Sequence, residues 1–520
     1  MSANHKILQS GLLLFSLVFI SKALAFLKDI ILAYTFGKGE LTDIYFIAFS
    51  IPHTLMYVMG ITLLRGMSSS VFSGMIAKKE DTALSILFST IFNGVFLFTA
   101  ALSAICIWQM PALIRMLPFT FYETDFDMTV LLARILFPLL ITLGLSDYCG
   151  AVLNAFRNFF LPGFSMILAN LCMIVSLLLL SDSLSILSIA YGTAAGFLIA
   201  LAVQFIFLIR SKIRYLFSTL NFTAPPVRSF IVKARPLILL TGISQISIFT
   251  SKIIALHMET GMVSALSYAE KVNEISISLF VLPLLTVLLP EFARETAVLN
   301  LEALKSRIRF GAEVIASIIT FIVVFLIVFH NEVIVLLFQR GEFTVSDSAV
   351  TGDILLIFVL GLIFQAGYLC CVFIYLGMQK TKALTVVGIL SYSVNIVLLF
   401  TLSHFYGVYG LAASFSITAA VYFLLLFSVF KKRYIAFSLW KQSRNLLKIA
   451  VSGVILLLSF YLVGLLFNAG RDMSFMSLAV FIAITGSAGL LFYMVLLNIF
   501  HVFEISDFLK GTGRYIRGQN

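Results

Sequence analysis

Apolar runs of about 20 residues recur from one end of this chain to the other, and they constrain its fold more than any other feature. A helix needs a run of about that length to cross the hydrocarbon core of a membrane. Of the 520 residues, 61% are hydrophobic and 11% are charged, whereas about 25% are charged in a soluble domain. The pattern therefore predicts an all-α polytopic membrane protein.

Fourteen such runs predict fourteen transmembrane helices. They cover approximately residues 10–36, 42–64, 84–108, 128–154, 160–180, 184–209, 236–257, 263–290, 311–337, 349–377, 383–403, 406–430, 449–468 and 474–500. Lys and Arg gather at both termini and in the loops after even-numbered runs. Because cytoplasmic loops are enriched in these residues, we expect both termini in the cytoplasm. The net charge of +11 then reflects these loops, and no nucleic-acid partner is expected.

An internal repeat divides the chain into two similar halves. The motif YGTAA at 191–195 recurs as YGLAA at 409–413, and Asn170 is echoed by Asn395. Six spans and one long basic loop make up a repeat, so corresponding spans run in the same direction, as in a parallel repeat. We predict a six-helix N-lobe over residues 1–210 and a cytoplasmic basic linker over 211–235. A six-helix C-lobe follows over 236–430, and two further spans with a C-terminal tail occupy 431–520.

Charged residues within the apolar runs gather at the beginnings of both halves. In spans 1 and 2 they are Lys22, Lys28, Asp29, Asp43 and Arg65; in spans 7 and 8, with the turn between them, they are Lys252, Glu259, Glu270, Lys271 and Glu274. A charge near the middle of a membrane helix costs about 2.5–3.5 kcal/mol, so it needs a partner or a wet cavity. Transporters built from repeats bind substrate between their halves. We therefore predict a cationic cavity for an anionic head group; ion pairs that only brace the helices are the alternative.

Other sequence features bear on ion binding and catalysis. Asp147, in span 4, is a candidate ion or proton site. No GxSxG, HExxH or GxxxxGK[ST] motif occurs, and neither the five cysteines nor the six histidines have the spacing of metal ligands. Since such motifs carry the commonest hydrolytic, metal and ATP chemistry, we expect a transporter with no catalytic residue, metal or bound cofactor.

Five stretches of the chain carry a resemblance to a known family. They are SKALAFLKDIILAYTFGKGELTDIYFIAFSIP at 21–52, RNFFLPGFSMILANLCMI at 157–174, ISQISIFTSKII at 243–254, SYAEKVNEISISLFVLPLLTVLLPEFAR at 267–294 and LFQRGEFTVSDSAVTGDILL at 337–356. They resemble the MurJ (MviN) family of lipid II flippases in the MOP exporter superfamily. The resemblance implies a fourteen-span fold that moves undecaprenyl-pyrophosphate-linked peptidoglycan precursor from the inner to the outer leaflet of the bacterial inner membrane. Membrane lipids and cell-wall synthesis enzymes are the partners it implies.

The resemblance also assigns roles to individual residues. Lys22, Lys28 and Lys271 stand at basic positions where arginine is usual, and we expect them to bind pyrophosphate with support from Lys252 and Arg65. We expect Asp29, Asp43, Glu270 and Glu274 to hold those cations and to take part in gating. Membrane potential or an ion gradient would drive the lobes between inward-open and outward-open states. An arginine expected after the Ile-Pro of span 2 is replaced by Met56 and Tyr57.

Three other functions remain open at this point. Lysine is a point charge, whereas arginine binds phosphate with two parallel hydrogen bonds, so the substrate could be another undecaprenyl-linked saccharide, such as an exopolysaccharide or O-antigen unit. A drug/cation antiporter of the same superfamily is less favoured, because such a site should be acidic. A membrane scaffold without transport activity is the third alternative.

Overall fold

The regular structure of the chain is helical throughout its described part. The computed structural model describes the backbone of residues 3–61, 68, 71–73, 75–76, 78, 80–116, 123–156, 158–210, 213–217, 219–298, 300–433, 439–467 and 474–502. The helices are α1 Ala3–Phe36, α2 Glu40–Val58, α4 Asp81–Trp108, α5 Met110–Met116, α6 Glu123–Leu136, α7 Leu139–Ala155, α8 Phe160–Leu184, α9 Leu187–Ile209, α10 Pro225–Leu256, α11 Met262–Ser276, the π-helix η1 Ile277–Val281, α12 Leu282–Ala297, α13 Leu301–Phe338, α14 Val345–Gly377, α15 Thr381–Arg433, α16 Leu439–Phe467 and α17 Phe475–Ile499.

The predicted all-α polytopic fold is confirmed. Among the described residues, eleven helical segments are long and apolar enough to cross a membrane. They cover the predicted spans 3 to 14, because one of them, Thr381–Lys432, contains two predicted spans. Helices α1 and α2 occupy the first two predicted spans. About fourteen membrane helices therefore fit this chain.

Helix α15 bends where the sequence places the junction between spans 11 and 12. Gly407 has φ +56° and ψ −137° inside the continuous element. Positive φ values are costly for residues with a Cβ but not for glycine. The backbone therefore changes direction at Gly407, and one long helical element contains two spans.

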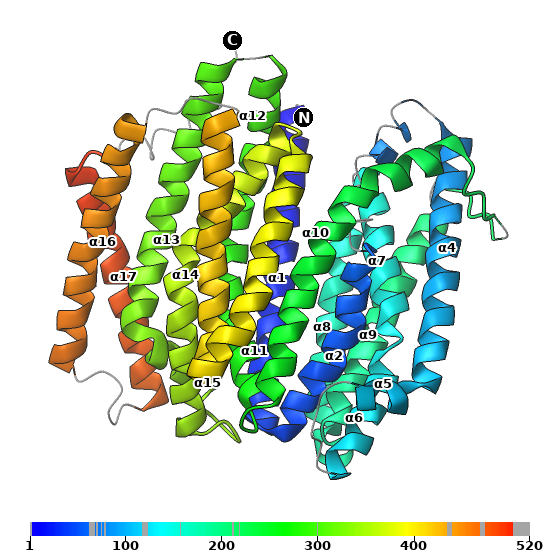
Figure 1. The fold of residues 1–520 in the computed structure, drawn as a ribbon, viewed down its shortest axis with the longest axis horizontal. Coiled ribbons are helices and arrows are strands. Elements are labelled where there is room, and N and C mark those ends of the chain that lie inside the picture. Colours follow the sequence, from blue (N-terminus) through cyan, green and yellow to red (C-terminus); the bar gives the residue numbers. More distant parts are fainter. Residues whose placement is uncertain are drawn as a thin grey trace. The chain divides into compact units, whose positions relative to one another are not determined.

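The chain forms two compact units, and the helices of each can be located in Figure 1 by their labels. The first consists of Met1–Ser267 and Arg340–Thr344, and the second of Tyr268–Gln339 and Val345–Asn520. Helix α10, the seventh span, belongs to the first unit, and its beginning at Pro225 lies within the predicted linker 211–235. The lobes and linker were inferred from the internal repeat, and their boundaries stay a prediction.

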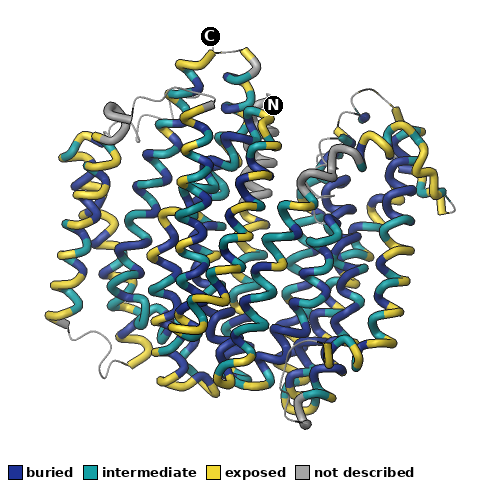
Figure 2. The backbone as a smooth tube through the Cα atoms, viewed as in Figure 1, coloured by how far each residue is buried: buried dark blue, intermediate teal, exposed yellow. Residues whose placement is uncertain are grey.

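In the first unit, α8 and α9 pack closely against each other through small residues. Gly192 and Gly196 are four residues apart, and a Cβ at Gly196 would lie 2.7 Å from the carbonyl oxygen of Ala169 on α8. Small residues at this spacing let membrane helices approach closely, so that dispersion contacts replace the missing hydrophobic effect. In Figure 2 buried residues, drawn dark blue, alternate along the helices with intermediate and exposed ones.

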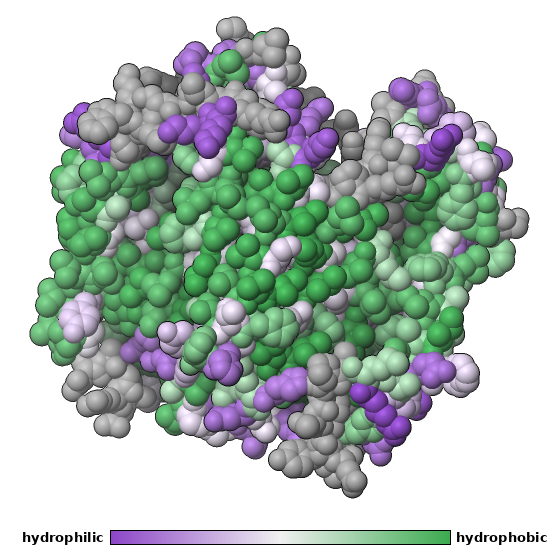
Figure 3. Space-filling view, viewed as in Figure 1, coloured by the Kyte–Doolittle hydropathy of each residue, from purple (hydrophilic) through white to green (hydrophobic). Residues whose placement is uncertain are grey.

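In the second unit, α13 contacts α14, α16 and α17. Phe329 interrupts α13 with φ −113° and ψ 23°. Its ring packs edge-on against Phe460 of α16, with the ring centroids 5.5 Å apart, and Phe321 packs against Tyr493 of α17 at 6.1 Å. These aromatic contacts attach the last two helices to α13. Figure 3 shows hydrophobic residues over the middle of the helices and hydrophilic residues toward their ends.

The segment after α9 is held against α4 by polar side chains. Asn93 donates from Nδ2 to the carbonyl oxygens of Leu216, Phe217 and Thr219 at 3.0, 3.0 and 3.1 Å, and its Oδ1 accepts from the hydroxyl of Tyr215. Ser89 of α4 accepts from the backbone N–H of Leu216 at 2.9 Å. The segment forms no helix or sheet hydrogen bonds of its own, so these side chains serve as partners for its backbone groups.

We expect Asn93→Ala to release this segment from α4. Asn93 is buried, and losing its bonds should lower the stability of this contact by roughly 1–3 kcal/mol. Limited trypsin digestion of the purified protein should then cut faster after the exposed Arg210 and Arg214. Ser183→Ala is the control, because its hydroxyl bonds only to its own helix. Equal digestion of Asn93→Ala and the wild type would contradict the assignment.

Candidate functional site

Helix α1 carries an ion pair within its apolar run. Lys28 Nζ lies 2.8 Å from Asp29 Oδ1, and the two side chains are 14% and 3% exposed. Lys28 and Asp29 are adjacent residues within the continuous helix α1, with apolar residues on both sides. Their adjacency in the sequence lets the two charged groups meet. A buried charge is tolerated when it is paired. Lys22, six residues before Lys28 on the same helix, is half-buried.

Asp43 accepts hydrogen bonds from the backbone at the beginning of α11. Its Oδ2 accepts from the N–H of Gly261 at 2.7 Å, and its Oδ1 from the N–H of Ser264 at 2.6 Å. The first N–H groups of a helix have no partner within the helix, and a carboxylate is the best acceptor for them because the helix dipole is positive there. Asp43, on α2, thus caps a helix more than 200 residues away in sequence.

Two glycine turns complete the surroundings of this cap. Gly261 has φ +88°, and a Cβ there would lie 2.9 Å from side-chain carbons of Lys38. Gly341 has φ +60°, and its Cβ would overlap the carbonyl oxygen of Tyr34, which accepts the N–H of Glu342 at 3.0 Å. The turns after α1, after α10 and after α13 therefore contact one another within the first unit, and glycine is required for that close approach.

Lys252, on α10, lies over an aromatic ring of α2. Its Nζ is 5.9 Å from the centroid of the Phe46 ring, within the range of a cation–π contact. The structure thus brings a cation of α10 beside the second turn of α2, and these two helices are in contact.

Lys271, Glu270 and Glu274 belong to the second unit. Lys271 and Glu270 are half-buried on α11, and Glu274 is exposed. Between them, Asn273 donates to Gln365 of α14 at 3.0 Å. The π-helix η1 begins three residues after Glu274, and π-turns of this kind are frequent at functional sites.

The remaining predicted residues are Asp147 and Arg65. Asp147 lies half-buried on α7 within the first unit. Arg65 lies outside the described residues. No group of three or more His, Cys, Asp or Glu side chains that could hold a metal ion occurs in the described part of the chain.

A row of rings on α2 was not identified from the sequence. Tyr45, Phe49, His53 and Tyr57 recur every four residues, and their successive centroids are 6.3, 5.6 and 5.0 Å apart. We call these four residues the α2 ring row. The signal was present in the sequence, because residues four apart share a helix face. Half-buried Tyr57 and buried Met56 occupy the place of the expected arginine.

Comparisons with known proteins agree with this architecture. A sequence model of the family described as lipid II flippase MurJ matches residues 32–498. A probable lipid II flippase MurJ of Rickettsia prowazekii is 26% identical over 442 residues, which cover 82% of this chain and 84% of the relative. The Vibrio cholerae protein of the same description is 26% identical over 451 residues, which cover 82% and 83% of the two chains.

Solved structures show the same fold. A structure described as lipid II flippase MurJ in an inward closed conformation matches with a TM-score of 0.78 at 24% identity, over 94% of this chain and 98% of that one. An inward-facing multidrug resistance MATE family transporter of the MOP superfamily matches with a TM-score of 0.68 at 13% identity, over 82% and 100%. At these identities the likeness is evidence for the fold alone.

We expect Asp43→Ala to destabilise the protein through loss of the α11 cap. Removal of a cap costs about 0.5–2 kcal/mol, so the thermal unfolding temperature of the purified protein should fall. Asp43→Asn keeps one acceptor oxygen and should fall less. Asp182→Ala, which removes an exposed carboxylate, is the control. Equal unfolding temperatures for Asp43→Ala and Asp182→Ala would argue against a capping role.

Proposed function

This chain belongs to the lipid II flippase MurJ family, and on that premise we propose that it moves lipid II from the inner to the outer leaflet of the bacterial inner membrane by alternating access. The family match covers most of the chain, and the curated relatives that carry this description are matched over most of their length. The chain is a multi-pass membrane protein by its helices and its family. We place both termini in the cytoplasm, because the basic loops lie on that side.

The observation that carries the proposal is the buried charge of α1. Lys28 and Asp29 form a contact of 2.8 Å inside an otherwise apolar helix, and intramembrane charges usually mark a substrate or ion pathway. In this proposal Lys22, Lys28 and Lys271 bind the pyrophosphate of the lipid, with Lys252 and Arg65 in support. A lysine ammonium donates to phosphate oxygens in several orientations, so the bound pyrophosphate is held by charge more than by fixed geometry.

The acidic residues keep the cationic site from repelling itself when it is empty. Asp29 neutralises Lys28, and we propose that Glu270 and Glu274 do the same beside Lys271. Asp43 contributes to gating through its contact with the beginning of α11, which must break if α2 and α11 separate. Membrane potential or an ion gradient supplies the driving force, with Asp147 as a candidate ion or proton site. We propose a transporter with no catalytic step and no bound cofactor.

The partners proposed here follow from the same role. The substrate is a lipid-linked anionic precursor, surrounding membrane lipids contact the apolar helix surfaces, and cell-wall synthesis enzymes make the substrate and consume it. The second candidate function is a flippase for another undecaprenyl-linked saccharide. It is favoured by one observation, because α2 carries no Lys or Arg between Glu40 and Val58 and Met56 is buried where arginine was expected.

Complementation tests the proposed function and its cations. Wild-type protein should restore growth to a strain depleted of its own lipid II flippase, and the triple variant Lys22→Ala, Lys28→Ala, Lys271→Ala should not, because its site loses three positive charges. The matched control is Lys380→Ala, Lys431→Ala, Lys432→Ala, which removes the same charge from exposed positions. Rescue by the first triple variant would refute the site assignment.

A leaflet-accessibility assay then separates transport from growth. In cells that are depleted of their own lipid II flippase and express this chain, lipid II should become accessible at the outer leaflet of the inner membrane. The wild type should produce this signal and the site triple variant should lose most of it. Absence of the signal with the wild type, together with transport of another undecaprenyl-linked saccharide, would favour the second candidate.

A further inference from the structure

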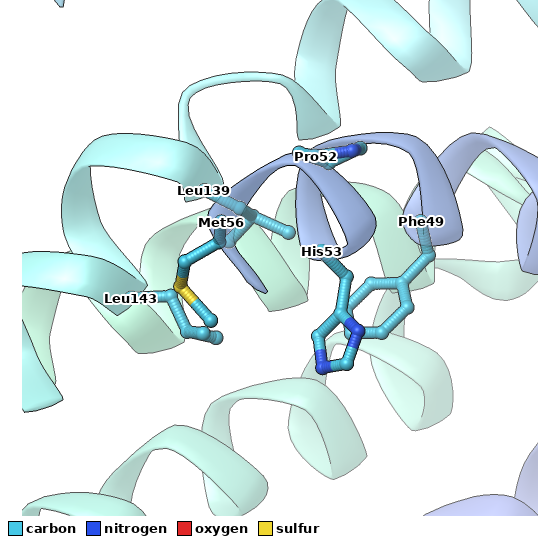
Figure 4. Close-up of a pocket in the computed structure, with 6 residues that line it drawn as sticks. All are labelled: Phe49, Pro52, His53, Met56, Leu139 and Leu143. Carbon is cyan, nitrogen blue, oxygen red and sulfur yellow. The ribbon is translucent and has the colours of Figure 1, made fainter. Parts of the chain in front are cut away.

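A small recess beside α2 is closed by the packing of its own walls. It is lined by Phe49, Pro52, His53, Met56, Leu139 and Leu143. Figure 4 shows the rings of Phe49 and His53 side by side and the Met56 side chain beside Leu143. The space has room for at most about one water molecule. The recess is therefore part of the packed core and offers no binding site.

Helix α4 carries a stripe of polar residues within a membrane span. Ser85, Ser89, Thr90 and Asn93 are all buried, and their spacing places them on one side of the helix. Such a stripe must be covered, because the hydrocarbon core offers it no partner. The cover is the segment between α9 and α10, of which the structure describes 213–217 and 219–224. We call these residues the α9–α10 connection, and Figure 1 shows them in green beside α4.

The polar stripe binds the backbone of the connection. N–H groups of the connection donate to its hydroxyls: Arg214 to Ser85 at 3.2 Å, Leu216 to Ser89 at 2.9 Å and Asn221 to Thr90 at 3.3 Å. Asn93 donates to three carbonyl oxygens at the far end of the connection. Irregular backbone is tolerated at membrane depth only where protein satisfies its polar groups. The stripe on α4 meets that requirement.

The contacts on α4 set the depth of the connection. The helix has 28 residues and is therefore about 42 Å long, whereas the hydrocarbon core is about 30 Å thick. For a centred helix the core begins about 6 Å from the first residue, at the level of Ser85. Asn93 lies about 18 Å from that end. The tip of the connection, which Asn93 holds, therefore lies inside the hydrocarbon core.

The side chains of the connection point in two directions. The ring of Tyr215 packs edge-on against Phe92 of α4, with the ring centroids 5.7 Å apart. Phe217 is 85% exposed, and Leu220 and Phe222 are exposed as well. An apolar side chain that is exposed at hydrocarbon depth contacts acyl chains, so it needs no protein partner. The connection thus has a face toward α4 and a face that suits lipid.

The cations of this region stand at the ends of the connection. Arg210, Arg214 and Arg228 are exposed. Arg214 lies at the level of Ser85, the boundary of the hydrocarbon core, from which a long basic side chain reaches the lipid phosphates. Residues 210–235 contain six Lys and Arg and no Asp or Glu. Their charge matches the anionic surface of a cytoplasmic leaflet.

We propose that the α9–α10 connection is a re-entrant membrane anchor, whose Phe217, Leu220 and Phe222 insert into the acyl chains of the cytoplasmic leaflet. The leaflet follows from the proposed orientation, because α4 is the third span and begins on the cytoplasmic side. The inference does not depend on which lipid is transported, and it places part of the predicted linker 211–235 in the membrane. Since α10 begins at Pro225, the anchor fixes where the seventh span enters the bilayer.

Quenching of tryptophan fluorescence tests the depth of the connection. The two native tryptophans are replaced as Trp108→Phe and Trp440→Phe, and Phe217→Trp is introduced into the full-length protein in phosphatidylcholine nanodiscs. Bromine atoms on the acyl chains should quench most of the emission, and aqueous iodide should quench little of it. The opposite pattern would place this segment in water, available to a cytoplasmic protein, and would overturn the inference.

Two reference positions calibrate the quenching. Phe96→Trp replaces a ring that is exposed in the middle of α4, and bromine should quench it as strongly as Phe217→Trp. Glu302→Trp replaces a side chain that is 85% exposed at the beginning of α13, and iodide should quench it instead. Leu220→Trp repeats the measurement on the same segment if thermal unfolding shows that Phe217→Trp is not folded.

Asn93→Ala, combined with Phe217→Trp, tests whether α4 holds the connection at this depth. The variant loses the bonds to three carbonyl oxygens, so the tip should move toward water. Quenching by bromine should then fall and quenching by iodide should rise. Ser183→Ala is the control, because its hydroxyl bonds only to its own helix. Unchanged quenching in the Asn93→Ala variant would refute the role of the polar stripe.

Failure of this inference and failure of the proposed function give different results. Growth complementation and the leaflet assay report lipid II transport wherever the connection lies. Quenching reports the position of Phe217→Trp whichever lipid is transported. A connection found in water would therefore refute the anchor and leave the flippase function standing.

Discussion

A charge placed at membrane depth must have a partner, and the ion pair of Lys28 and Asp29 meets that requirement on α1. The hydrocarbon core offers no water, so an isolated ammonium or carboxylate there would cost several kcal/mol. The two adjacent side chains lie 2.8 Å apart, which lets an otherwise apolar helix keep polar groups inside the bilayer. A third charge, Lys252 of α10, lies over an aromatic ring instead, with its Nζ 5.9 Å from the centroid of the Phe46 ring of α2. The proposed binding of pyrophosphate by α1 depends on this ion pair.

The same constraint acts on the backbone at helix ends. Asp43 satisfies N–H groups of Gly261 and Ser264, and Asn93 satisfies carbonyl groups after α9. In both cases a buried side chain replaces water as the partner of unpaired backbone groups. Such contacts are discrete, because a hydrogen bond to a carboxylate is either made or broken. The cap by Asp43 thus connects α2 to the beginning of α11.

Much of the fold could be predicted from the sequence, and particular residues show why. Apolar runs set the number and place of the membrane helices, and the bend at Gly407 lies at the junction predicted between two runs. Asn170 and Asn395, which correspond in the internal repeat, both make polar contacts, although their partners differ. Asn170 donates to Ser21 of α1, and Asn395 donates to Thr418 within α15. The α2 ring row could have been found from its four-residue spacing, but no rule of composition singles out rings that are already common in an apolar chain.

The sequence by itself determined that this chain is an all-α membrane protein of the MurJ family with charges in its first and eighth spans, because hydropathy and motif spacing are local properties that do not depend on packing. Only the tertiary structure decided what those charges contact. Lys28 pairs with Asp29, Lys252 lies over Phe46, and Asp43 caps a helix more than 200 residues away. These partners are set by which helix faces meet, and helix periodicity places a residue on a face without stating which other helix that face will touch.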